Sequence, residues 1–115
     1  MTEELPTFEN QESFEQRLTR LLKAKGIDDQ ETKELLNNWT SEQEKQVEHS
    51  DDYQAEQIQF NLRRARLYFE AGYIEEAFAN FEAAREQAWN ERRDELYQSI
   101  MKEMGEIEDF LEEKK

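Results

Sequence analysis

Apolar residues recur along this chain at intervals of three and four positions, which is the spacing of one helix face and not the alternation of a β-strand. The first such run comprises Phe14, Leu18, Leu21 and Leu22. We expect Asn10 to cap it, because an asparagine side-chain oxygen accepts from the exposed N–H groups of a first helical turn. Gly26 follows the run, at a position where a helix end often needs a left-handed residue. The pattern predicts a helix over about 11–25.

The segment IDDQETKELLNNW restarts the helical spacing, with one aspartate of its DD pair as the capping residue. Its stripe comprises Thr32, Leu35, Leu36 and Trp39. The next segment, TSEQEKQVEHSDDYQ, contains almost no apolar residues, and Ser41 precedes Glu44 at the spacing of a capping box. Two interpretations stay open, because a new helix can begin at Ser41 or one polar helix can run through. A break between Ser50 and Tyr53 is compatible with both.

A stronger pattern begins at Tyr53 and predicts a helix over about 53–71. Its apolar face comprises Ile58, Leu62, Ala65 and Phe69, widened by Leu67 and Tyr68. Gly72 is expected to end this helix with a left-handed conformation. The next helix face comprises Ile74, Ala77, Phe78, Phe81, Ala84 and Ala88. Because the connection at Gly72 is so short, these two helices are expected to pack antiparallel.

A last helix is predicted over about 91–112. Its apolar positions are Leu96, Ile100, Met104, Ile107 and Leu111. Gly105 stands inside this helix and should weaken it by about 1 kcal/mol relative to alanine. The predicted fold is therefore all-α, with about five helices in a single domain over 10–113, preceded by a flexible acidic tail over 1–9.

The composition supports this fold. The chain has one proline and three glycines in 115 residues, fewer chain breakers than an all-β protein would need. Charged residues make up 38% and the net charge is -14, which favours disorder, but aromatic residues make up 11%, which favours an ordered core. The segment MTEELPTFEN has no apolar run of the kind found in secretory signals, and cysteine is absent, so we expect a cytoplasmic protein.

The segment 58–91 resembles a tetratricopeptide repeat, a pair of antiparallel helices of about 34 residues. The positions that match are Ala65, Tyr68, Gly72, Ala77, Phe81 and Ala84. The resemblance implies a hairpin in which alanines let the two helices approach, with the helix over 91–112 as a capping helix. Three positions depart from the repeat pattern: Asn61, Arg64 and Trp89. Repeats of this family generally serve protein–protein interaction.

Sets of residues that carry catalysis or bind metals are not evident. His49 is the only histidine, whereas a zinc site needs several histidine or cysteine ligands. The aspartate pairs at Asp28 and Asp51 lack the central glycine of a calcium-binding loop and are better explained as helix caps. Three scattered glycines cannot form a phosphate-binding loop. We therefore expect no enzymatic activity, no metal and no cofactor.

The arginines are a clearer sign of a binding site than any of these, because six of the eight lie within 31 positions. These six are Arg63, Arg64, Arg66, Arg85, Arg92 and Arg93. Pairing at helical spacing would explain most of them, and the expected pairs are Arg66 with Glu70, Arg85 with Glu82 or Glu86, and Arg92 with Glu95.

The resemblance adds a second interpretation, in which the first helix of each pair lines a ligand-facing groove. It implies a partner-binding site made by Arg63, Arg66, Arg93 and Tyr97. Arginine forks bind carboxylates with two hydrogen bonds, so an acidic peptide or a C-terminal carboxylate is the expected ligand.

The favoured function is a non-enzymatic interaction module that binds a protein or peptide partner, or a second copy of itself. For a homodimer, the candidate contact residues are Phe78, Trp89, Tyr97 and Phe110. One alternative is a nucleic-acid-associated protein that uses the Arg63–Arg93 cluster, although a net charge of -14 repels phosphates and anionic membranes alike. The other alternative is an acidic mimic that occupies a basic surface on a partner.

Overall fold

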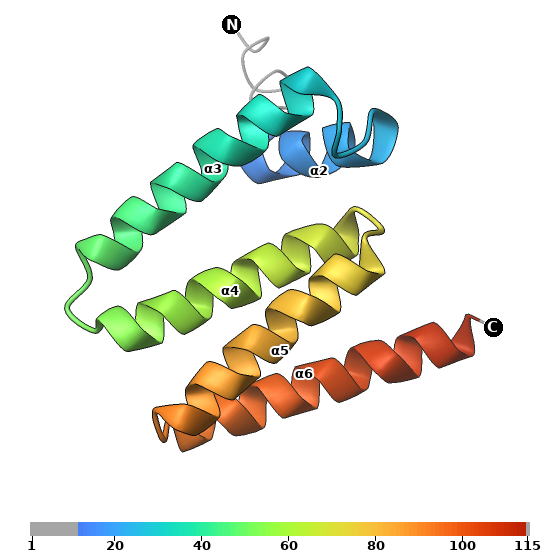
Figure 1. Ribbon diagram of the computed structural model, residues 1–115. Helices are drawn as coiled ribbons and strands as arrows, with labels where there is room; N and C mark the ends of the chain where they lie inside the picture. Colours follow the sequence, from blue (N-terminus) through green and yellow to red (C-terminus); the bar gives the residue numbers. More distant parts are fainter. Residues whose placement is uncertain (1–11, 115) are drawn as a thin grey trace, which may run out of the picture.

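The computed structural model describes residues 12–114, and within this range the chain forms five α-helices and no β-strand (Figure 1). The helices are α2 (Phe14–Ala24), α3 (Gln30–Glu48), α4 (Tyr53–Glu70), α5 (Ile74–Asn90) and α6 (Asp94–Glu113). Because the described residues form helices and no strand, the all-α prediction is confirmed. Successive helices are joined by short turns. The predicted tail over 1–9 lies outside the described residues.

The first helix begins later than the sequence pattern predicted. Ser13 caps α2: its hydroxyl accepts from the Gln16 N–H at 3.0 Å, and the Gln16 side chain accepts from the Ser13 N–H at 2.9 Å. This reciprocal pair satisfies two exposed donors and fixes the helix start at Phe14. The expected cap, Asn10, lies outside the described residues. Gly26 ends the helix as predicted, with φ of 91°.

The polar segment after Trp39 belongs to one continuous helix, which decides between the two interpretations of this region. Asp29 caps α3 by accepting from the Thr32 N–H at 3.1 Å, and the helix then passes through Ser41 without a break. Its buried face continues from Trp39 through Gln43 to Val47. These positions are four apart, so a single helical stripe survives although glutamine occupies its middle.

The turns after α4 and α5 have the same backbone geometry. After α4, the Tyr73 N–H donates to the Tyr68 carbonyl at 2.8 Å around Gly72, whose φ is 91°. After α5, the Arg93 N–H donates to the Ala88 carbonyl, also at 2.8 Å. Both are Schellman turns, which need a left-handed residue just after the helix. The prediction that Gly72 ends α4 is confirmed.

In the second turn the left-handed residue is Arg92, with φ of 59°. Because no glycine marks this turn, the sequence pattern placed the start of the last helix too early. The helix begins at Asp94 and not near residue 91. Gly105 lies inside α6, as predicted.

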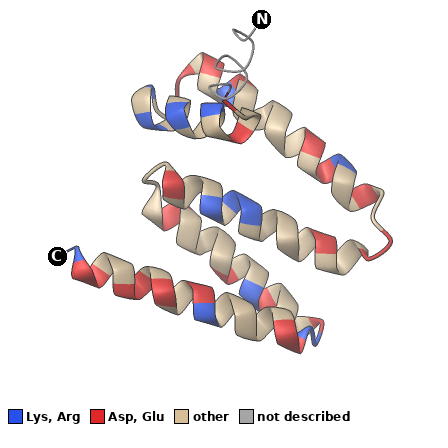
Figure 2. Cartoon of the chain, turned by 180° about the vertical axis from the view of Figure 1, so that it is seen from behind, with Lys and Arg blue, Asp and Glu red and all other residues tan. Residues whose placement is uncertain are grey.

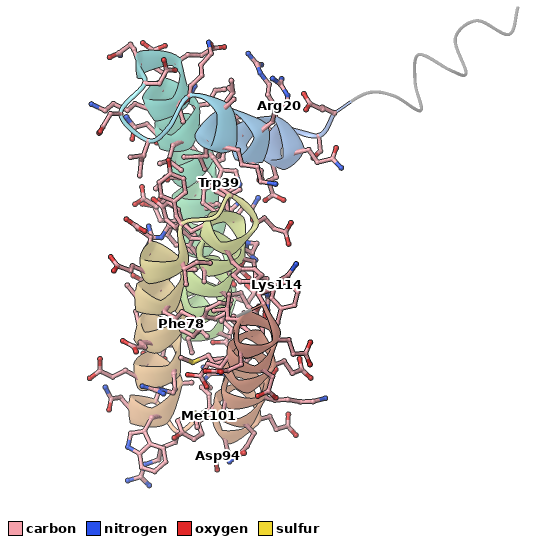
Figure 3. The ribbon with its side chains drawn as sticks, turned by 90° about the vertical axis from the view of Figure 1, so that its right-hand side faces the viewer. Arg20, Trp39, Phe78, Asp94, Met101 and Lys114 are labelled. Carbon is pink, nitrogen blue, oxygen red and sulfur yellow. The ribbon has the colours of Figure 1, made fainter. Side chains whose placement is uncertain are left out.

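Two hydrophobic clusters form the core, and α4 contributes to both. The C-terminal cluster comprises Ile58, Leu62, Ala65, Phe81, Ala84, Ala88, Ile100 and Met104. The N-terminal cluster comprises Leu18, Leu22, Trp39, Val47, Phe60, Leu67 and Ala71. The helix α4 therefore buries two of its faces, one against α5 and α6 and the other against α2 and α3. In Figure 3, α5 lies on one side of the molecule, whereas α2 and α6 lie on the other.

The alanine and aromatic positions of the predicted hairpin pack as expected. Ala65, Ala77 and Ala84 are each 0% exposed, and Phe81 is buried beside them. Tyr68 is half-buried, and its ring lies 6.2 Å from that of Tyr73. Small side chains at the crossing of α4 and α5 let the two backbones approach closely, which is why alanine stands there.

Tyr73 joins the two halves of the molecule. Its hydroxyl accepts from the Ile27 N–H at 3.0 Å and donates to the Leu22 carbonyl at 3.2 Å. One side chain in the turn between α4 and α5 thus binds the turn between α2 and α3. The Ile27 N–H lies in the turn after α2, outside regular helical pairing, so the hydroxyl satisfies a donor that would otherwise need water. The Leu22 carbonyl also accepts from the Gly26 N–H, so the hydroxyl adds a second bond there.

Candidate functional site

The four residues predicted to bind a partner do not form one group. Arg63 and Arg66 lie on α4 and line the same cleft against α2. Arg93 precedes α6, and Tyr97 lies one turn later with its ring 5.1 Å from that of Trp89. Neither Arg93 nor Tyr97 lines that cleft. The structure therefore separates the predicted set into two places.

Arg66 pairs with α6 and not with its own helix. Its Nε and Nη2 donate to the two carboxylate oxygens of Glu103 at 2.8 and 2.9 Å. This fork raises the pKa of Arg66 above its ordinary value, because the carboxylate favours the charged guanidinium. The expected pair with Glu70 was wrong, since the side chain reaches across the space between α4 and α6.

Arg63 and Arg93 also hold acids of this chain. Arg63 donates to Glu56 at 2.8 Å and to the Gln43 side chain of α3. Arg93 donates to both Asp52 oxygens at 2.7 and 2.8 Å, and this hydrogen-bonded arginine holds the pKa of the Asp52 carboxyl below its ordinary value. The three guanidinium groups predicted to receive a ligand carboxylate are thus already engaged with carboxylates of the protein.

Arg64 explains two departures from the repeat pattern together. Its Nε donates to the Asn80 side chain of α5 at 2.7 Å, and its Nη2 donates to Asn61 at 3.3 Å. The guanidinium also lies 4.7 Å from the centre of the Phe60 ring. Polar residues at positions 61 and 64 therefore form a network between α4 and α5, where the repeat pattern would place larger apolar side chains.

The remaining expected pairs do not form. Arg85 directs Nη1 towards the Met101 sulfur at 3.9 Å, and it makes no ion pair with Glu82 or Glu86. Arg92 forms no ion pair with any residue of the described range 12–114. The predictions for these two arginines were therefore wrong, and among residues 12–114 neither guanidinium group has an acidic partner.

Two clefts flank α4 and share residues on it. The first, of about 590 Å³, lies between α2 and α4, and the second, of about 510 Å³, lies between α4 and α6. Arg66 and Glu70 line both, so the two clefts are neighbours on α4 that share these side chains. We call the two clefts together the α2–α4–α6 groove. Sequence reasoning missed Phe69, Glu70 and Ile107 as parts of it, because only the packing of α2 and α6 beside α4 makes these positions line a cleft.

The groove combines free carboxylates with an apolar wall. Phe69 and Phe110 meet edge to face with ring centres 6.1 Å apart, and Phe110 stays 47% exposed. Glu70 is exposed and has no hydrogen-bond or ion-pair partner among the described residues. In Figure 2, red acidic positions recur along the ribbon of α6, whereas a cluster of blue basic positions lies on α4. The two arginines of the groove, Arg63 and Arg66, are each paired with a carboxylate, whereas Glu70 is unpaired within the described range, so the charge that remains in the groove is negative.

A second exposed surface lies at the opposite end of the α5–α6 pair. It is formed by Trp89, Tyr97 and Met101, and we call it the Trp89 surface. Trp89 is 65% exposed and Met101 is 41% exposed. The two other residues predicted for a homodimer contact lie apart from it: Phe78 packs against the C-terminal cluster and Phe110 lines the groove.

Within residues 12–114, no group of three or more histidine, aspartate or glutamate side chains is arranged to hold a metal ion. None of the described helices is both long enough and apolar enough to cross a bilayer. Comparison with protein-family models, with curated proteins and with solved structures gave no match to this chain.

Proposed function

We propose that this protein is a non-enzymatic interaction module that holds a segment of a partner protein in the α2–α4–α6 groove. The observation behind the proposal is that two clefts, of about 590 and 510 Å³, share Arg66 and Glu70 and together border α2, α4 and α6. Two neighbouring clefts bordered by three helices suit an extended chain segment better than a compact metabolite. The resemblance of 58–91 to a tetratricopeptide repeat supports the same function, since such repeats present grooves to partner segments.

The ion pairs disfavour the nucleic-acid alternative. Arg63, Arg66 and Arg93 each hold a carboxylate, so they add little positive potential for a phosphate backbone. The net charge of -14 opposes such binding further.

The test compares two exposed phenylalanines. Phe110 is 47% exposed and lines the groove, whereas Phe14 is 42% exposed and lines neither cleft. A protein captured by the tagged chain is purified, and its affinity is measured by calorimetry for the wild type, Phe110→Ala and Phe14→Ala. We expect Phe110→Ala to weaken binding about tenfold, because an aromatic anchor leaves the interface, and Phe14→Ala to leave it unchanged. Equal affinities for all three proteins would exclude the groove.

A second copy of the chain is the other candidate partner, and the Trp89 surface favours it. Trp89 is the most exposed of the large hydrophobic side chains in the described range, and tryptophan is enriched among residues that dominate interfaces. Arg85, which lines the same cleft as Trp89, has no acidic partner within the described range, so Glu82 or Glu86 of a second copy offers one. Sedimentation equilibrium at increasing concentration tests this, with Trp89→Ala expected to abolish the dimer and Phe110→Ala to preserve it.

A further inference from the structure

The geometry points to one class of occupant for the groove: a polypeptide segment that carries a lysine or arginine beside a bulky apolar side chain. This inference rests on the proposed function and specifies its ligand. It is the opposite of the acidic ligand that the arginines suggested in the sequence.

The two arginines of the groove are already paired with carboxylates of this chain. Arg66 is held by both oxygens of Glu103 at 2.8 and 2.9 Å, and Arg63 is held by Glu56 at 2.8 Å. An acidic ligand would have to displace one of these carboxylates. The exchange would replace one carboxylate with another and leave Glu103 or Glu56 beside it without a partner, so it offers no net gain. The arginines therefore shape the groove and do not attract anions to it.

Two carboxylates of the groove remain accessible to a ligand. Glu70 has no partner among the described residues and lines both clefts. Glu106 lines the α4–α6 cleft, and its ion pair within residues 12–114 is the 3.9 Å contact with the exposed Lys102. A basic side chain of a ligand would gain a hydrogen bond to Glu70 without breaking an existing pair, and at Glu106 it would compete only with this long, exposed contact. This is the charge complementarity that selects a cationic segment.

An apolar wall lies beside these carboxylates. Phe69, Ile107 and Phe110 line the same cleft as Glu70 and Glu106. Phe69 directly precedes Glu70 on α4, so the apolar and acidic positions are adjacent. A ligand must therefore present its basic and bulky apolar side chains close together. The chain's own first 11 residues, MTEELPTFENQ, contain three glutamates and no lysine or arginine, so they lack the required chemistry.

Selection from a random library of 12-residue peptides tests the ligand class without assuming a partner. We expect peptides selected by the wild type, and not retained by Phe110→Ala, to be enriched in lysine or arginine next to leucine or an aromatic residue. A consensus rich in aspartate or glutamate would overturn the inference and leave the proposed function standing. If the wild type selects nothing that Phe110→Ala fails to retain, both fall.

A matched charge test separates the groove from general attraction to an acidic protein. The probe is the best basic peptide from the selection, measured by calorimetry at low and moderate salt. Glu70→Gln should weaken it about two- to fivefold, the size expected of one exposed charge pair. Glu44→Gln, the same change at an exposed position of α3 that lines neither cleft, should alter affinity less than twofold. Equal losses for both variants would show diffuse attraction and overturn the inference.

Discussion

The two halves of this molecule are built differently. In the C-terminal half, α4, α5 and α6 pack through small side chains, and Ala65, Ala84 and Ala88 are each 0% exposed. In the N-terminal half, α2 and α3 pack around one large residue, Trp39, whose ring lies 6.0 Å from that of Phe60 on α4. The C-terminal core is made by three consecutive helices joined by short turns. The N-terminal core also needs residues of α4, which follows α2 and α3 in the sequence.

This difference suggests an order of dependence between the halves. The cluster around Phe81 uses residues of α4, α5 and α6 alone. The cluster around Trp39 needs Phe60, Leu67 and Ala71 of α4 in addition to α2 and α3. The N-terminal half should therefore require the C-terminal half for its fold, whereas the reverse requirement should be weaker.

The two cores can be compared through Phe81→Ala and Trp39→Ala. Each removes a buried aromatic ring and should cost about 3–5 kcal/mol of unfolding free energy within its own cluster. Loss of Phe81 should lower the hydrogen-exchange protection of all five helices, because α2 and α3 rest on α4. Loss of Trp39 should lower protection in α2 and α3 and leave α5 and α6 protected. Uniform loss in both variants would show a single cooperative unit instead.

The link between the halves is tested by Tyr73→Phe. The change leaves the Ile27 N–H and the Leu22 carbonyl without the hydroxyl that now pairs with them. We expect a loss of about 1–3 kcal/mol in urea unfolding, because a partly buried donor loses its partner. Tyr53→Phe serves as control, since Tyr53 is 58% exposed and should cost almost nothing. A neutral Tyr73→Phe would mean that the hydroxyl does not join the halves.

The two Schellman turns allow a comparison of opposite sign. Gly72→Ala should destabilise by about 1 kcal/mol, because alanine resists a positive φ. A Cβ at Gly72 would meet no atom within 4 Å, so backbone conformation alone should set this cost. Arg92→Gly should stabilise by about 0.5–1 kcal/mol, because glycine accepts the φ of 59° that arginine holds there. Thermal unfolding measures both changes, and a shift in the same direction for the two variants would contradict this explanation.

The smallest effect concerns pH. The hydrogen-bonded Arg93 lowers the pKa of Asp52 below its ordinary value of 3.8. A carboxyl whose pKa is lower in the folded state stabilises the fold above its unfolded pKa, and this contribution disappears as the pH falls through the folded pKa. Urea midpoints measured between neutral pH and pH below about 4 should therefore fall less in Asp52→Asn than in the wild type. Identical pH profiles would show that this exposed pair contributes nothing.

Local patterns were enough for much of the fold. The spacing of Ile58, Leu62 and Ala65 identified α4, and Gly72 identified its end, because helix faces and left-handed turns have strong local signatures. The turn at Arg92 was missed because its residue lacks the usual signature and the rest of the structure imposes the conformation. The continuity of α3 through Gln43 was left open, because its burial depends on contact with α4, where Arg63 donates to it.

The candidate site was much harder to predict than the fold. Arg63 and Arg66 were identified as notable, and both do line the groove. Their electrostatic state could not be predicted, because Glu103 lies 37 positions from Arg66 and no local spacing connects them. The carboxylate of Glu70 stays free because Arg66, its expected partner, pairs with Glu103 of α6.

By itself, the sequence determined which segments become helices, where most of them end and which of their faces are apolar, since these properties depend on residues within a few positions of one another. The tertiary structure decided which arginines pair with distant acids and which acids stay free. Arg66 pairs with Glu103 and Arg93 with Asp52, at separations of 37 and 41 positions, because helix packing brings these side chains together. With 29 acidic residues available, spacing along the chain cannot choose among them. The chemistry of the groove depends on that choice.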